Sequence, residues 1–140
     1  MLRVAALIVL LVAALSRVVP PPVHEEYHGG QLQLSHVCNI YLGRVEINGI
    51  DANYYLAKVL TRLNRGLTCQ KPVLVQAKES TQLHLRHNQA LKPEGYELRV
   101  DQEGIHIAYS QYSGYVYALE TFWQLVEDGG VKHCFIKDEP

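Results

Sequence analysis

The stretch YELRVDQEGIHIAY, residues 96–109, decides the fold of this chain. Its apolar residues Tyr96, Leu98 and Val100 alternate with polar ones and so share one face of a strand. The polar segment that follows ends in Gly104, a residue suited to a turn position with positive φ. Apolar residues then alternate again, at Ile105, Ile107 and Tyr109. We therefore predict a β-hairpin with one buried face.

A helical period follows the hairpin. Apolar residues recur at helical spacing from about Tyr115 to Glu127, and Gly129-Gly130 ends the segment. The apolar set comprises Tyr115, Ala118, Leu119, Phe122, Trp123 and Val126. We expect this helix to cover one face of the sheet.

The residues before the hairpin predict further strands and another helix. Apolar residues from Ala52 to Leu63 repeat at helical spacing, with Asp51 as N-cap and Gly66 as stop. The strand candidates are Gln31–Leu34, Arg44–Ile47 before the turn dipeptide Asn48-Gly49, Val73–Val75 and Leu83–Arg86. The predicted class is α+β, a mainly antiparallel sheet with two helices packed on one face.

The composition is that of a foldable chain without a nucleic-acid footprint. The 140 residues are 48% hydrophobic, and 13 Lys and Arg residues against 14 Asp and Glu residues leave a net charge of -1. No basic stripe is present to neutralise phosphates, so we expect no nucleic-acid partner. The length is that of about one domain and excludes a full (β/α)₈ barrel within these residues.

The first residues predict a signal peptide over residues 1–16. Val4–Leu15 is an uninterrupted apolar run, followed by small residues that a signal peptidase reads. Arg17 and the run Pro20-Pro21-Pro22 stop it well short of the ~20 residues of a membrane-spanning helix. We expect export, with membrane contact only if the segment stays uncleaved as a signal anchor. Residues 17–30 then form an extended lead-in.

Export would place the three cysteines in an oxidising compartment, where pairing is the default. The favoured disulfide joins Cys38 and Cys69, because the predicted helix between them could return the chain to a neighbouring position. The sequence alone does not determine which cysteines pair. With that pairing, Cys134 would have to find its partner outside this stretch.

The histidines offer one match to a catalytic motif. His24-Glu25-Glu26-Tyr27-His28 satisfies H-E-x-x-H, which on a helix places two zinc ligands and a glutamate base on one face. Prolines before it and glycines after it disfavour a helix, so we interpret it as a solvated segment. His84, His87 and His106 are interpreted as sheet-surface histidines. We assign no metal ligand and no cofactor.

Acidic pairs and tyrosines are two further candidates. Two glycosidase carboxylates must converge across a cleft, so adjacency in sequence is weak evidence. The pairs are Glu25-Glu26, Glu127-Asp128 and Asp138-Glu139. Three interpretations are open for the tyrosine cluster: a platform on which sugar rings stack, an exposed surface that binds a partner, or a packed junction between sheet and helix. The cluster comprises Tyr109, Tyr112, Tyr115 and Tyr117. No catalytic residue is assigned from either set.

Three motifs carry a resemblance to a known family. They are EGYELRV at Glu94–Val100, EGIHI at Glu103–Ile107 and GYVYALETFWQLV at Gly114–Val126. Together they resemble the N-terminal domain of the eukaryotic β-N-acetylhexosaminidases, family 20 glycoside hydrolases. The resemblance implies a domain over residues 31–135 with two helices on one face of its sheet, sometimes called zincin-like although it binds no zinc.

In that family a (β/α)₈ barrel holds the chemistry. An Asp-Glu pair acts there, with Glu as general acid/base and the substrate's own 2-acetamido carbonyl oxygen as nucleophile. Ile136–Pro140 resembles the link into the barrel, so no catalytic or sugar-binding residue is carried onto this chain. The resemblance implies an accessory domain or truncated form of a secreted or lysosomal/vacuolar enzyme that removes terminal N-acetylhexosamines.

Two hypotheses on function follow. In the first, the partner is the barrel of the same polypeptide, any dimer forms through that barrel, and the chain by itself is inactive. In the second, the chain is a non-enzymatic secreted module that binds a protein or a glycan through the helix and the tyrosines.

Overall fold

The computed structural model describes residues 18, 20–34, 39–41, 46–52, 73–75 and 82–140. Three expectations fall outside these residues. They are the signal peptide at residues 1–16, the body of the helix expected from Ala52 to Leu63, and the Cys38–Cys69 disulfide. The described part contains no helix that is long and apolar enough to span a membrane.

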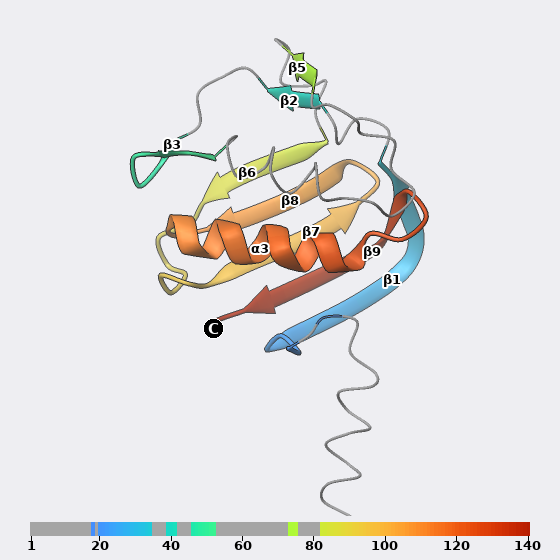
Figure 1. Ribbon diagram of the computed structural model, residues 1–140. Coiled ribbons are helices and arrows are strands. Elements are labelled where there is room, and N and C mark those ends of the chain that lie inside the picture. The colour runs from blue at the N-terminus through green and yellow to red at the C-terminus, as the bar shows by residue number, and fades with distance from the viewer. Residues whose placement is uncertain (1–17, 19, 35–38, 42–45, 53–72, 76–81) are drawn as a thin grey trace, which may run out of the picture.

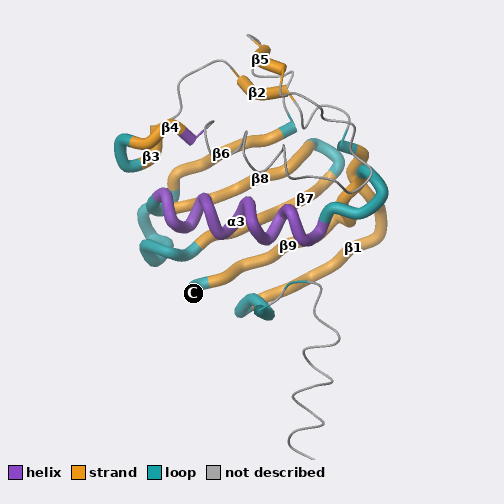
Figure 2. Tube along the Cα trace, viewed as in Figure 1, coloured by secondary structure: helices purple, strands orange, loops and turns teal. Residues whose placement is uncertain are grey.

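A five-stranded sheet covered on one face by a helix forms the body of the described residues (Figures 1 and 2). The strand order is β1-β9-β7-β8-β6. The elements are β1 His24–Gln33, β6 Leu83–His87, β7 Tyr96–Asp101, β8 Gly104–Tyr109, α3 Tyr112–Leu125 and β9 Gly130–Asp138. Two small sheets accompany it, a parallel pair of β2 Asn39–Tyr41 with β5 Val73–Val75 and the hairpin β3 Glu46–Ile47 with β4 Ile50–Asp51.

The hairpin predicted at residues 96–109 is confirmed. β7 and β8 pair antiparallel from Tyr96↔Tyr109 to Asp101↔Gly104. Gly104 has φ +142°, and a Cβ there would lie 2.4 Å from the Gln82 carbonyl oxygen. The Ile105 N–H donates to that same carbonyl at 2.7 Å. A side chain at position 104 is therefore excluded both by backbone conformation and by the preceding segment.

The sheet is mixed, which corrects the expectation of a mainly antiparallel arrangement in one place. Three neighbouring pairs are antiparallel, whereas β6 runs parallel to β8 from Leu83↔Ile105 to His87↔Tyr109. The reason is topological. β7 follows β6 in the chain and reverses direction, and β8 reverses again before it inserts between them.

Helix α3 confirms the second predicted helix but not a pair of helices. It begins three residues before the predicted Tyr115 and ends at Leu125, and it is the single helix assigned in full among the described residues. Gln111 at its N-cap makes no side-chain capping bond. The Asn48 side-chain oxygen, from the β3–β4 turn, accepts a hydrogen bond from the Tyr112 N–H at 2.7 Å instead. The helix start is thus set by a residue 64 positions away, which local sequence does not reveal.

The core lies between α3 and the sheet. The apolar residues of β7 and β8 are fully buried, and Ala118, Leu119 and Phe122 of α3 pack against them. The Tyr96 hydroxyl shares a buried hydrogen bond with Thr121 of α3. Desolvation by burial raises the pKa of Tyr96 to about 12, so this hydroxyl keeps its proton at neutral pH. The predicted apolar faces of hairpin and helix are the faces that meet.

β1 is longer than predicted, and β9 is a strand that was not predicted. β1 begins at His24, within the segment predicted as a lead-in, and its pairing with β9 is irregular between Tyr27 and Gln31. β9 takes in Ile136, Lys137 and Asp138, residues expected to start a linker, and Ile136 is fully buried. These strands pair across 97 to 113 residues, from Gln33↔Gly130 to His24↔Lys137. The end of β1 confirms the strand predicted at Gln31–Leu34, whereas the rest of β1 and β9 lack the regular alternation that predicts a strand.

Candidate functional site

The sheet face opposite α3, here called the outer face, carries a group of charged and imidazole side chains with binding chemistry. Strand alternation places them there, because the alternate residues of β7 and β8 face the core. They are His84, Arg86, Glu97, Arg99, Asp101, His106 and Lys137, and the apolar residues Ala108 and Phe135 lie among them. The sheet register arranges these residues in rows across the strands.

One row consists of four planar side chains on four adjacent strands. His84 on β6 is the partner of His106 on β8, which is the partner of Arg99 on β7, which is the partner of Phe135 on β9. The two imidazole rings stack, with centroids 5.0 Å apart and planes inclined by 24°. We call these four residues the planar row. At ~4.8 Å per strand, it extends over about 14 Å.

The neighbouring row contains a hollow. Ala108 lies there between its register partners Arg86 and Glu97, and its short side chain leaves space that the longer ones surround. A cavity of about 520 Å³ opens at this place, lined by members of both rows. Its volume is in the range of small-molecule sites in proteins. The sequence does not reveal it, because a small residue produces a hollow only when the register places long ones around it.

Each cationic side chain of the outer face lies near a carboxylate. Arg99 lies 3.5 Å from the carboxylate of Asp101. The guanidinium of Arg86 lies 4.0 Å from Oε2 of Glu97, and Nζ of Lys137 lies 4.0 Å from its Oε1. The three cationic side chains of this face therefore share two carboxylates, and all three lie within 4.0 Å of one of them.

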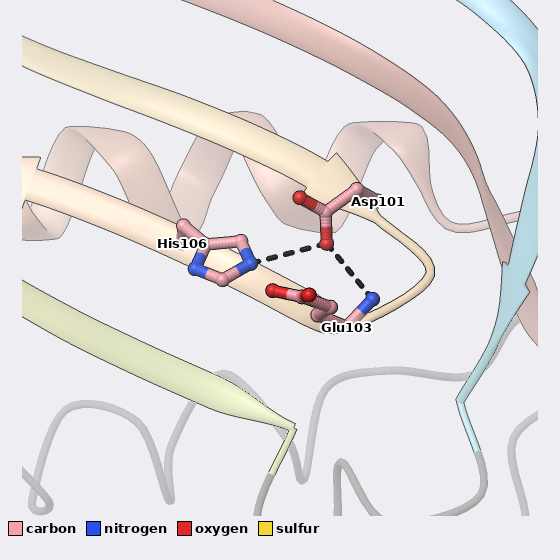
Figure 3. A group of neighbouring side chains, drawn as sticks. All are labelled: Asp101, Glu103 and His106. Atoms are coloured by element: carbon pink, nitrogen blue, oxygen red, sulfur yellow. Dashed lines mark hydrogen bonds and ion pairs between the residues drawn. The ribbon is translucent and has the colours of Figure 1, made fainter.

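A cluster of possible metal ligands sits at the end of the hairpin (Figure 3). One ligand atom from each of Asp101, Glu103 and His106 lies within 4.8 Å of the others. Sequence reasoning assigned no metal ligand here and did not group these residues, although D-x-E-x-x-H around a tight turn is a usable signal. Two carboxylates and an imidazole suit a divalent cation such as zinc.

The contacts of Asp101 account for this cluster without an ion. Its Oδ1 accepts hydrogen bonds from the Glu103 N–H at 2.9 Å and from His106 Nε2 at 3.1 Å. Partial burial by itself would raise the pKa of Asp101, but these two hydrogen bonds and the charge of Arg99 lower it overall. A metal would have to replace bonds that already close the turn, so the cluster is best described as a turn lock.

The H-E-x-x-H segment is not helical, as its prolines and glycines predict, but it lies on a strand rather than in the expected lead-in. His24 to His28 form the start of β1, and both histidines are exposed. His24 Nε2 lies 3.4 Å from Glu26, and its ring lies 5.7 Å from the ring of Phe135. The Glu25 carboxylate accepts a hydrogen bond from the Tyr27 hydroxyl. The helical geometry of a zinc peptidase is therefore not formed here.

The acidic pairs occupy separate structural positions. Glu127 and Asp128 are exposed in the turn before β9. Asp138 accepts hydrogen bonds from the N–H groups of Val23 and Glu139, and Glu139 lies 3.3 Å from Lys92 Nζ. These contacts hold the end of β9 to the strand and turn beside it.

The tyrosines form a packed junction. Tyr115 is fully buried and donates a hydrogen bond to the Ala52 carbonyl at 2.9 Å, and Tyr109 is 7% exposed. Tyr112 is half-buried against Tyr115, whereas Tyr117 is 40% exposed on α3. Since two of the four rings lie in the core, these residues present no common stacking surface.

His87, which was also predicted to be a surface residue, is exposed at the end of the edge strand β6.

Comparison with known protein families identifies this fold. The profile described as glycosyl hydrolase family 20, domain 2, matches residues 15–139. The chain belongs to this family. The family 20 resemblance of the hairpin and helix motifs is thereby confirmed.

Solved bacterial enzymes contain the fold of this family 20 domain. The exo β-N-acetylglucosaminidase of Vibrio harveyi, solved with N-acetylglucosamine, matches with a TM-score of 0.66 and 23% identity over 89% of this chain. The N-acetyl-β-hexosaminidase of Streptomyces plicatus matches with a TM-score of 0.67 and 19% identity over 89% of it. The β-N-acetylhexosaminidase of Bacteroides fragilis matches with a TM-score of 0.66 and 19% identity over 88% of it.

The family 20 domain is a small part of these enzymes. The matched region covers 19% of the Vibrio harveyi chain, 26% of the Streptomyces plicatus chain and 25% of the Bacteroides fragilis chain. Because these enzymes are bacterial, the similarity to eukaryotic enzymes in particular stays a prediction.

Proposed function

We propose that this chain is the accessory domain of a β-N-acetylhexosaminidase and that it carries no hydrolytic activity of its own. The observation that carries the proposal is the match of residues 15–139 to domain 2 of the family. A second observation agrees with it. Asp101 is engaged in the turn lock, Asp138 and Glu139 make strand-end contacts, and Glu127 and Asp128 are exposed.

The proposed substrate would bind to the proposed barrel and not to the residues of this chain. A (β/α)₈ barrel joined to this domain would cleave terminal N-acetylhexosamine residues from glycoconjugates, with the substrate's acetamido oxygen as nucleophile. Helix α3 covers the face away from the planar row (Figure 1), and the β3–β4 turn contacts its start through Asn48. Ile50 of β4 and Tyr117 of α3 are exposed. This is the side on which we place the barrel.

The first test is hydrolysis by the chain alone. Purified chain is expected to release chromophore from a chromogenic N-acetylglucosaminide at the rate of buffer. Turnover above buffer that disappears in Asp138→Asn or Glu139→Gln would contradict the proposal, because it would show a carboxylate at work within these residues.

The second test supplies the barrel. The chain is joined after Pro140 to the barrel of the Streptomyces plicatus enzyme, and the same barrel is produced alone. We expect the joined protein to be more soluble and more active per mole of chain. A barrel that folds and hydrolyses equally well by itself would contradict an accessory role.

We also propose that the chain enters the secretory pathway and works outside the cell or in a lysosomal or vacuolar lumen. The apolar run Val4–Leu15 supports this, as does the small-residue site at its end. The same location would favour the Cys38–Cys69 disulfide.

A further inference from the structure

We propose that the outer face of this domain binds a neutral glycan chain containing N-acetylhexosamine, along the planar row and in the hollow beside it. The inference rests on the proposed function, because an accessory domain of a hexosaminidase would encounter such chains.

The planar row offers flat groups at one end and polar ring edges at the other. Sugar rings present C–H faces that pack on flat side chains, and Phe135 and Arg99 are flat groups held side by side by the sheet register. The two imidazoles stack on each other, so they offer a ligand their edges. Phe135 is only partly buried, so part of its ring remains accessible. A row of about 14 Å accommodates a short oligosaccharide rather than a single sugar.

The hollow supplies the selectivity. Its floor is the methyl group of Ala108, and its rim carries the guanidinium of Arg86 and the carboxylate of Glu97. An acetamido methyl group can enter the hollow while its N–H and carbonyl reach the carboxylate and the guanidinium on the rim. A sugar with a hydroxyl group at that position would leave the hollow unfilled.

The pairing of the cationic side chains decides which type of glycan the face fits. Arg86 and Lys137 share Glu97, and Arg99 is paired with Asp101. A sulfated or otherwise polyanionic chain would have to break these pairs, whereas hydroxyl and amide groups can bridge them. The surface therefore favours a neutral chain.

The experiment is a titration of the ¹⁵N-labelled full chain with N,N′,N″-triacetylchitotriose at pH 7, followed by heteronuclear NMR. Cellotriose, which has the same linkage without acetamido groups, is the matched probe. We expect saturable shifts at Arg99, Ala108 and Phe135, and at least about tenfold weaker binding of cellotriose. Absence of saturable shifts at those residues up to about 10 mM sugar, or equal binding of the two sugars, would overturn the inference.

Three variants locate the site. Ala108→Leu fills the hollow and Phe135→Ala removes the end of the row, and each is expected to weaken binding about tenfold. Tyr117→Ala removes an exposed aromatic ring from α3, the opposite side, and is the control expected to bind normally. Near-ultraviolet circular dichroism verifies that each variant is folded. Weakening by Tyr117→Ala with unchanged binding by folded Phe135→Ala would overturn the assignment and favour the tyrosine-bearing helix.

The experiments distinguish failure of the proposed glycan site from failure of the proposed accessory role. A chain that does not bind the chitin trimer but supports an active joined barrel would refute only the glycan site. A chain that binds the trimer but leaves the barrel unaffected would refute the accessory role in hydrolysis and retain the site.

Discussion

Close approach of two backbone segments depends on a single glycine at the start of α3. A Cβ on Gly114 would lie 2.3 Å from the carbonyl oxygen of Gly95 in the turn before β7. Alanine is the better helix former by about 1 kcal/mol, so helix propensity and packing predict opposite signs for Gly114→Ala. We expect packing to outweigh helix propensity, because the Gly95 carbonyl oxygen belongs to the backbone and cannot rotate away from the new Cβ.

We therefore expect Gly114→Ala to lower the free energy of unfolding by about 1–3 kcal/mol. Urea denaturation of the variant and the parent measures the difference. Gly29→Ala is the matched control, since a Cβ at that position meets nothing within 4 Å. A variant at position 114 that is more stable than the parent would show that the turn moves freely.

The turn lock makes one carboxylate a source of pH-dependent stability. The pKa of Asp101 is lowered in the folded chain, so its contribution to stability is present above the unfolded pKa of about 3.9 and is lost as pH falls through the folded value. Asp101→Asn should cost about 0.5–1 kcal/mol at pH 7, and this difference should shrink toward pH 3. Thermal unfolding at both pH values measures it, with Glu94→Gln as an exposed control. A cost that is the same at both pH values would assign the effect to packing instead.

Among the elements, α3 depends on a turn that is remote in sequence. Asn48 has φ 53° and Gly49 has φ 76°, the geometry of a two-residue hairpin turn that the dipeptide Asn48-Gly49 predicts. What the dipeptide does not predict is that the same asparagine accepts the Tyr112 N–H and so caps α3. Turn formation and helix capping are thereby coupled.

This coupling predicts different effects for two substitutions at one position. Asn48→Gly keeps the positive φ but removes the acceptor, and we expect it to lower the free energy of unfolding by about 1 kcal/mol. Asn48→Asp keeps an acceptor and adds negative charge near the helix N-terminus, so it should be neutral or stabilising. Chemical denaturation of both variants measures the effects. Equal losses in the two would mean that the capping bond contributes nothing measurable.

For the whole molecule, the prediction concerns export and oxidation. When the gene is expressed in a eukaryotic secretory host, we expect the mature chain to begin at Arg17 and to contain the Cys38–Cys69 disulfide. N-terminal sequencing and peptide mapping without reduction measure the two features independently. Recovery of a cytosolic chain that retains residues 1–16 would contradict export, and a disulfide between Cys134 and either other cysteine would contradict the pairing.

The local sequence pattern was sufficient to predict those elements whose interacting residues lie close together in the chain. The β7–β8 hairpin, the apolar stripe of α3 and the β3–β4 turn were all predicted, because a two-residue period, a helical period and a turn dipeptide each act over a few residues. The motifs in the same stretch were also sufficient for the family. The position of β9 beside β1, and the parallel pairing of β6 with β8, were not predictable, since such pairing depends on distant segments.

The sequence by itself therefore determined the buried faces of the central hairpin and helix, and the family to which they belong. Only the tertiary structure decided what the polar face of the sheet presents. His84, Arg99, His106 and Phe135 come from four strands, and nothing in their spacing announces a row. They form one because strand order and register bring them level, and Ala108 becomes the floor of a hollow for the same reason.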